Sequence, residues 1–177
     1  MEFEKLAAGR FSVRKFKDIP VEAEKIRKIL QTGRIAPTAS NRQPQRLLVL
    51  TEQADLEKTD QTTRCRFGAR LVIAVCADTE DCWVSPIGGQ KSWQVDSAIV
   101  TDHMMHQAQD LGLGSLWVMF FDTEKFSSLF SLPDNIVPLS LLMTGYSADD
   151  AEPSEKHAVR YPLDHTVLNY EEIKKYL

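Results

Sequence analysis

Apolar runs of strand length recur along this chain of 177 residues. The runs at residues 47–51 and 71–77 are continuous, which is typical of strands that are covered on both faces of a sheet. Residues 116–121 form a third apolar run of this length, and residues 137–145 a fourth. We therefore predict a sheet of four largely buried strands.

Helical patterns alternate with these runs. The spacing of Ile26, Ile29 and Leu30 is that of an amphipathic helix, and this helix should end before Pro37, because proline disfavours helical geometry in the residue before it. Asp122 is a suitable N-cap for a helix that follows the third strand. The other predicted helices cover residues 3–9 and 92–111, and the helix that Asp122 caps extends to residue 130. Strands that alternate with helices favour an α/β or α+β sandwich.

The helix at residues 92–111 is apolar around most of its circumference. A helix of this kind must be buried on nearly all sides, and in a chain of this length a second subunit covers the outer side most simply. We therefore predict a homodimer with this helix in the interface; burial within the monomer is the alternative. Its apolar residues are Trp93, Val95, Ala98, Ile99, Val100, Met104, Met105, Ala108 and Leu111.

Composition and charge exclude several classes of partner. With 43% hydrophobic and 26% charged residues, the chain is typical of one globular domain, which we place at residues 1–177. The 25 acidic residues outnumber the 21 basic ones, so we expect no nucleic-acid partner. The longest apolar run is far shorter than the roughly 20 residues of a membrane span, so we expect no membrane insertion.

The three cysteines and the amino terminus favour a cytoplasmic protein. Cys65, Cys76 and Cys82 are odd in number and have no Cys-x-x-Cys spacing, which fits reduced thiols better than disulfides or a zinc site. Cys76 lies in an apolar run and is expected to be a core residue. The first residues are charged and have no apolar segment, so we expect no signal peptide.

Two polar segments are candidates for ligand binding. Arg10, Ser12 and Arg14 lie two apart, so in an extended segment their side chains leave from one side, as a phosphate site requires. In the loop at residues 36–44, amide side chains offer both donors and acceptors to the edge of a heterocycle. Each segment also has a plain interpretation: solvated surface residues for the first, a capping turn for the second.

Two further segments carry weaker signals. Asp102, His103, His106 and Asp110 have helical spacing but match no known ligand pattern, so we predict no metal site. The loop at residues 83–91 is either a mobile substrate lid or an ordinary surface loop.

In these segments and others, in the same order, the chain resembles the nitroreductase family of FMN-dependent oxidoreductases. The opening segment is similar to the family's Arg-x-Ser-x-Arg-x-Phe signature, and the polar loop to its Ala-Pro-(Ser/Thr)-Ala-x-Asn-x-Gln-Pro loop. The matching segments are residues 10–16, 36–44, 93–98, 111–118, 145–146 and 157–163.

The resemblance implies an α+β fold, a three-layer sandwich with a central, mainly antiparallel sheet flanked by helices, in an interlocked homodimer. It implies FMN as cofactor and hydride transfer from NAD(P)H through the flavin to a small planar acceptor such as a nitroaromatic, a quinone or an enone. Alternatives are a reductase of one specific metabolite and a non-catalytic FMN-binding sensor or storage protein. No acid or base is assigned.

The resemblance also implies roles for individual residues. Arg10, Ser12 and Arg160 would hold the FMN phosphate, with Phe11 beside them, and Arg14 would join them or reach the pyrimidine edge of the flavin. A backbone N–H near Met119 would point to flavin N5. The residues that would contact the flavin partly from the neighbouring subunit are Pro37, Thr38, Ser40, Asn41 and Gln43, and those that would line the ring system are Trp117, Met119 and Phe120.

Three positions depart from the family pattern. Met119 and Phe120 stand where small residues or an acidic residue and glycine are usual, which narrows the flavin pocket. Ala158 stands where many members of the family have a phosphate-binding lysine, a role in which His157 would substitute. Gln45 stands where tryptophan is common, which removes an aromatic wall.

Overall fold

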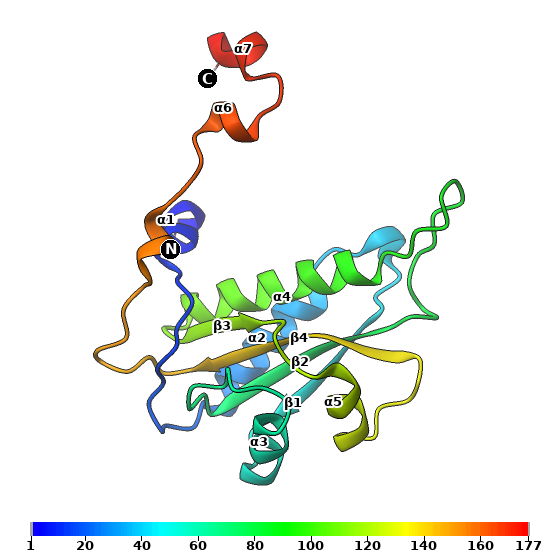
Figure 1. Ribbon diagram of the computed structural model, residues 1–177, viewed down its shortest axis with the longest axis vertical. Coiled ribbons are helices and arrows are strands. Elements are labelled where there is room, and N and C mark those ends of the chain that lie inside the picture. The colour runs from blue at the N-terminus through cyan, green and yellow to red at the C-terminus, as the bar shows by residue number, and fades with distance from the viewer. Residues whose placement is uncertain (1, 177) are drawn as a thin grey trace.

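Four antiparallel strands form the centre of the computed structural model, which describes residues 2–176 (Figure 1). The strands lie in the order β1-β2-β4-β3. All four predicted strands are present. The third strand begins and ends earlier than predicted, and it ends at Val118 because Met119 and Phe120 leave the sheet and face solvent. The strand bounds are β1 Gln45–Leu50, β2 Leu71–Asp78, β3 Gly114–Val118 and β4 Ile136–Gly145.

The predicted helices are present. Among the longer helices of residues 2–176, one was not indicated by the sequence pattern. This helix, α3, has few apolar residues, and only Leu56 and Thr59 are buried, so it has no recognisable apolar stripe. The longer helices are α1 Phe3–Gly9, α2 Ala23–Ile35, α3 Gln53–Asp60, α4 Trp93–Asp110 and α5 Thr123–Leu129. Short helical turns are η1 Ala39–Asn41, η2 Glu155–Ala158, α6 Leu163–Thr166, α7 Tyr170–Ile173 and η3 Lys174–Tyr176.

Helices cover both faces of the sheet, as the continuous apolar strands predicted. Alternate residues of β2 enter two separate cores: Ile73 packs with α2 and α4, and Ala74 packs on the opposite side with α3 and α5. Helix α2 lies very close to α4 at Gly33, where an added Cβ would stand 2.8 Å from Met104 Cγ. The result is the three-layer α+β sandwich.

Helix α4 is only partly apolar on its outer side. Val100, Met104 and Ala108 are buried against the sheet. On the outer side, Val95 is 62% exposed. Further along the helix, the charged side chain of Asp102 is 48% exposed. The apolar outer surface is therefore confined to the first half of the helix.

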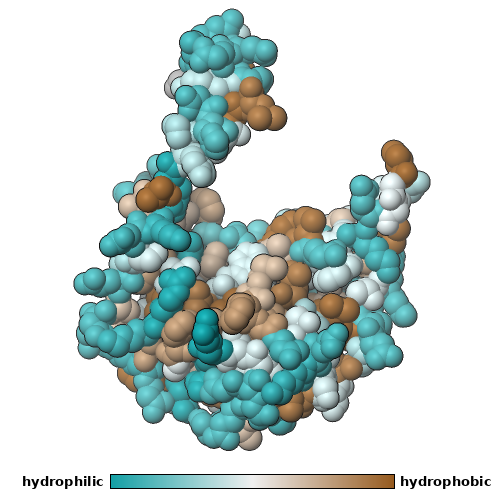
Figure 2. All heavy atoms as spheres, in the orientation of Figure 1, coloured by the Kyte–Doolittle hydropathy of each residue, from teal (hydrophilic) through white to brown (hydrophobic). Residues whose placement is uncertain are grey.

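Two segments project from the body of the molecule. The C-terminal arm, residues 152–176, runs away from the sheet (Figure 1). Several of its apolar side chains are exposed, among them Val159, Leu163 and Leu168. The β2–α4 hairpin, residues 83–92, projects on the other side, closed by a bridge between Val84 and Lys91. Figure 2 shows open space between them and hydrophobic side chains on the body below.

In the part of the chain that the structure describes, no helix has the length and apolar character to cross a membrane.

Candidate active site

A cationic pocket lies where the N-terminal segment meets the C-terminal arm. The backbone N–H of Val13 donates to the carbonyl of Ser115 at 3.0 Å, which fixes the segment along the edge of β3. Val13 is buried and Phe11 packs on the same core, so the alternate residues Arg10, Ser12 and Arg14 face away from it, as predicted. The pocket is lined by Arg10, Phe11, Ser12, Arg14, Ser154, Lys156, His157 and Arg160.

The donor set of this pocket matches a phosphate group. Four of the lining side chains are cationic at neutral pH and none is acidic. An arginine guanidinium can donate two parallel hydrogen bonds to the oxygens of a phosphate, and a hydroxyl group adds a further short hydrogen bond. Arg160 and Arg14 are positioned by their own backbone: Arg160 Nη1 donates to the carbonyl of Val159 at 2.8 Å, and Arg14 Nη1 to that of Ser12 at 3.3 Å.

Ser154 and Lys156 also line the pocket, and the sequence analysis missed both of them. The family's lysine position is occupied by Ala158, but Lys156 stands two positions earlier in the η2 turn, and its side chain lines the pocket together with His157. His157 also stacks edge-on against Phe11, with ring centroids 6.3 Å apart. A lysine within one turn of Arg160 was the available signal.

The polar loop at residues 36–44 has a strained backbone. Ser40, Asn41 and Gln43 have φ angles of 50°, 51° and 51°, in the left-handed region that favours glycine, and their side chains are exposed. Thr38 braces the loop, because its carbonyl accepts from the N–H of Asn41 at 2.9 Å and its hydroxyl from the N–H of Gln43 at 3.1 Å. Strain of about 1–3 kcal/mol per residue of this kind is often found at functional sites.

The cationic pocket and the polar loop lie far apart within one chain. The pocket adjoins the start of β3, opposite Gly145, whereas the loop leads into β1 at the other edge of the sheet, level with Val137. The eight residues between these positions span roughly 25 Å along the strand, and two strands separate β1 from β3. Figure 1 shows the two segments on opposite sides of the molecule. A single chain therefore does not bring together the two predicted halves of the site.

The remaining predicted residues lie in β3 or directly after it, and they do not line the cationic pocket. Trp117 is half-buried on the α4 side, and its indole Nε1 is buried without a hydrogen-bond partner among the described residues. Met119 and Phe120 are 66% and 67% exposed. The carbonyl of Phe120 accepts from the Thr63 hydroxyl at 2.6 Å, and the Arg64 guanidinium lies 5.6 Å from the centre of the Phe120 ring. Arg64 is a second cation that the sequence analysis did not single out.

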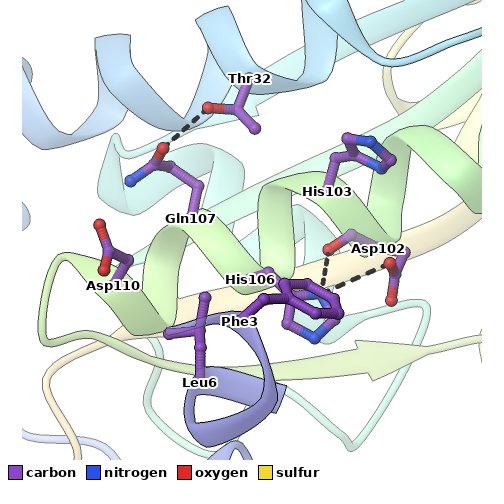
Figure 3. Close-up of a pocket in the computed structure, with 8 residues that line it drawn as sticks. All are labelled: Phe3, Leu6, Thr32, Asp102, His103, His106, Gln107 and Asp110. Carbon is purple, nitrogen blue, oxygen red and sulfur yellow. Dashed lines mark hydrogen bonds and ion pairs between the residues drawn. The ribbon is translucent and has the colours of Figure 1, made fainter. Parts of the chain in front are cut away.

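A larger groove lies between α1, α2 and α4 (Figure 3). The Nδ1 atoms of His103 and His106 hydrogen-bond to the carbonyls of Ile99 and Asp102, at 2.9 and 3.0 Å. Among residues 2–176, no group of three histidine, cysteine or acidic side chains is placed to hold a metal ion. The groove is lined by Phe3, Leu6, Thr32, Asp102, His103, His106, Gln107 and Asp110.

Cys76 lies in the core, as predicted. It is 1% exposed, and burial raises the pKa of its thiol to about 12, so it remains protonated at neutral pH. It is therefore unsuited to nucleophilic chemistry.

Comparison with known proteins identifies the family. The model of the Nitroreductase family matches residues 7–71 and 66–146. A crystal structure of a nitroreductase family protein from Clostridium difficile is 43% identical, with a TM-score of 0.89 over 94% of this chain and 97% of that one. A relative from Archaeoglobus fulgidus, whose name combines NADH dehydrogenase with NAD(P)H nitroreductase, is 29% identical over 84% of this chain and 87% of its own.

A structure from Exiguobacterium sibiricum that was solved in complex with FMN has the same fold, with 20% identity and a TM-score of 0.83 over 94% of this chain and 96% of that one. The chain belongs to the nitroreductase family of FMN-dependent oxidoreductases.

Proposed function

We propose that the protein transfers hydride from NAD(P)H, through FMN, to a small planar acceptor such as a nitroaromatic, a quinone or an enone. The observation that carries the proposal is the cationic pocket, whose arginine, lysine and serine side chains suit the phosphate of the cofactor. When bound, the flavin supplies the hydride chemistry, and the chain supplies binding, orientation and electrostatics.

The residues around the pocket have distinct tasks in this proposal. Arg10, Ser12, Lys156 and Arg160 bind the phosphate, and Phe11 closes the pocket on the core side. Arg14 belongs to the same lining and either joins the phosphate or extends to the pyrimidine edge, where a cation favours the reduced, anionic flavin.

Trp117, Met119 and Phe120 would line the ring system. Met119 and Phe120 are large and exposed, and they leave less room above the ring than the small residues usual in the family. A flat acceptor fits such a narrow space better than a branched one.

We also propose that the active form is a homodimer, because the predicted site is divided within one chain. Pro37, Thr38, Ser40, Asn41 and Gln43 are too far from the cationic pocket of their own chain for one FMN molecule to touch both. A second chain solves this problem by presenting its polar loop to the pocket of the first. The apolar outer surface at Val95 and the solvent-exposed apolar residues of the C-terminal arm suit such an interface.

The proposal is tested with the purified protein under anaerobic conditions. The protein should bind FMN, and its yellow colour should bleach with NADH or NADPH and return on addition of a nitroaromatic or a quinone. Protein that takes up no FMN would overturn the proposal. Yellow protein that neither nicotinamide bleaches would indicate a sensor or storage protein, and turnover with only one among many acceptors would indicate a metabolite-specific reductase.

The proposed cellular location is the cytoplasm. All three cysteines are free thiols in the structure, which suits a reducing compartment that supplies reduced nicotinamide cofactors.

A further inference from the structure

A buried carboxylate joins the polar loop to helix α4. Asp96 lies in the first turn of α4 and is 1% exposed. Its Oδ1 accepts a hydrogen bond from the backbone N–H of Ala39 at 2.9 Å, and its Oδ2 accepts one from the Ser92 hydroxyl at 2.6 Å. A carboxylate is costly to bury unless such donors satisfy it, so these two contacts define where the side chain can lie.

The Ser92 hydroxyl extends the connection to the β2–α4 hairpin. Its oxygen accepts from the backbone N–H of Trp83 at 3.1 Å, and the backbone N–H of Ser92 donates to the carbonyl of Trp83 at 2.9 Å. The single carboxylate of Asp96 therefore connects three elements: the polar loop, the base of the hairpin and the start of α4. We call this set of hydrogen bonds the Asp96 clasp.

The clasp acts at the residue that precedes the strained part of the loop. Ala39 stands immediately before Ser40 and Asn41, whose φ angles are positive without the help of glycine. The carbonyl of Ala39 also accepts from the N–H of Arg42 at 3.1 Å. A loop of this kind relaxes to a more favourable backbone unless its surroundings hold it, and the bond from Ala39 to the helix is one such restraint.

A second restraint holds the far end of the loop. Arg42 Nε donates to the carbonyl of Asp81 at 2.9 Å, and Arg46 Nη1 donates to that of Gln43 at 3.1 Å. Unlike these exposed contacts, the bond from Ala39 is part-buried and ends on a carboxylate that is 1% exposed, so water replaces this partner less readily than it replaces an exposed one. We therefore expect the conformation of the loop to depend more on the clasp than on these exposed contacts.

We propose that Asp96 is a positioning residue for the flavin site: it holds the polar loop in the conformation that presents the side chains of Ser40, Asn41 and Gln43 to the flavin ring. The inference rests on the proposed function, in which this loop contacts the ring. Asp96 itself touches neither the cofactor nor the substrate.

The test compares the affinities of the dimeric protein for FMN and for riboflavin, which lacks the phosphate, by quenching of flavin fluorescence. Asp96→Ala should weaken the binding of both ligands by the same factor, about tenfold or more, as for the loss of a charge-assisted hydrogen bond. Asp96→Asn should restore most of the affinity, because the amide oxygen can still accept from Ala39. Arg10→Ala should instead weaken FMN much more than riboflavin.

Thr101→Ala is the matched control. Thr101 is buried in the same helix. Its hydroxyl donates to the carbonyl of Ser97 at 2.8 Å and faces the Ser140 hydroxyl at 3.3 Å, and neither of these hydrogen bonds involves the loop. It should leave both affinities unchanged. An equal loss in Thr101→Ala and Asp96→Ala, or unchanged affinities in Asp96→Ala, would overturn the positioning role.

Hydrogen exchange of the unmutated protein gives a second measurement in case Asp96→Ala fails to fold. The N–H of Ala39 should exchange slowly, and the Ser92→Ala variant, which removes one donor to the carboxylate, should accelerate its exchange. Rapid exchange in the unmutated protein would contradict the clasp. Failure of the unmutated protein to bind either flavin would count against the proposed function, whereas normal binding combined with an insensitive Asp96 would count against this inference alone.

Discussion

At the scale of single residues, the sequence was most informative where geometry is local. The shared direction of Arg10, Ser12 and Arg14 follows from the two-residue period of an extended segment, and the structure has it. For Lys156 the available signal was its position within one turn of Arg160, but the path of the chain after β4, which brings it to the pocket, was not predictable. The left-handed backbone of Ser40 was not predictable either, because the residue there is not a glycine.

Removing Arg10 should weaken FMN retention by one to two orders of magnitude. The reason is that a hydrogen bond between charged groups contributes roughly 1.5–3 kcal/mol. Equilibrium dialysis of Arg10→Ala measures the effect, with Arg34→Ala as control, since Arg34 bonds only to Gln31 on the outer surface of α2 among the contacts seen. Equal retention by the two variants would remove Arg10 from the site.

A lysine at position 158, where the family usually has one, should take over the proposed role of Lys156 in binding the phosphate. Lys156→Ala should reduce FMN affinity about tenfold while riboflavin affinity stays the same, because only the phosphate loses a partner. Adding Ala158→Lys to this variant should recover part of the loss. A deficit that is equal for both flavins would show that Lys156 supports the fold of the arm rather than the phosphate.

At the scale of elements, strongly apolar segments were predicted well, and polar ones were not. Strand β2 and helix α4 were evident from their apolar residues. Helix α3 escaped because it buries only Leu56 and Thr59, and a surface helix with so small a buried face gives no periodic signal. The end of β3 was placed too late because exposed Met119 and Phe120 continue its apolar run.

The contact between the Arg10–Arg14 segment and β3 should be sensitive to added bulk. A Cβ at Gly114 would lie 2.7 Å from Val13 Cγ2, and Val13 is buried, so Gly114→Ala should separate the two segments. We expect a loss of about 1–3 kcal/mol in the free energy of unfolding, together with weaker FMN binding. Gly9→Ala is the control for denaturant titrations, since a Cβ there meets nothing within 4 Å; equal stabilities would contradict the close contact.

At the scale of the whole molecule, the fold and the two halves of the candidate site could be predicted, but their separation could not. Only the strand order places the Arg10 pocket and the Asn41 loop at opposite edges of the sheet. The predicted homodimer reconciles this separation with a single flavin site. It remains a prediction, and the apolar outer residues of α4 give a direct way to test it.

A charge at Val95 should separate the subunits. Val95 is 62% exposed in the single chain, so Val95→Asp should leave the subunit folded but place an unpaired carboxylate in the interface. Light scattering should then report a monomer, and FMN affinity should fall with it. Gln94→Asp, at the neighbouring exposed position, controls for charge. A Val95→Asp dimer with full FMN affinity would exclude this face of α4 from the contact.

The left-handed turn at Ser40 also bears on laboratory evolution of the enzyme. Glycine adopts this backbone without steric penalty, so Ser40→Gly should raise the melting temperature slightly, by an amount equivalent to at most about 1 kcal/mol. Selection for heat resistance alone would accept such a change, whereas selection for turnover would reject it, because the freed loop presents its side chains less often. Directed-evolution campaigns that monitor both properties should find them in opposition at this turn.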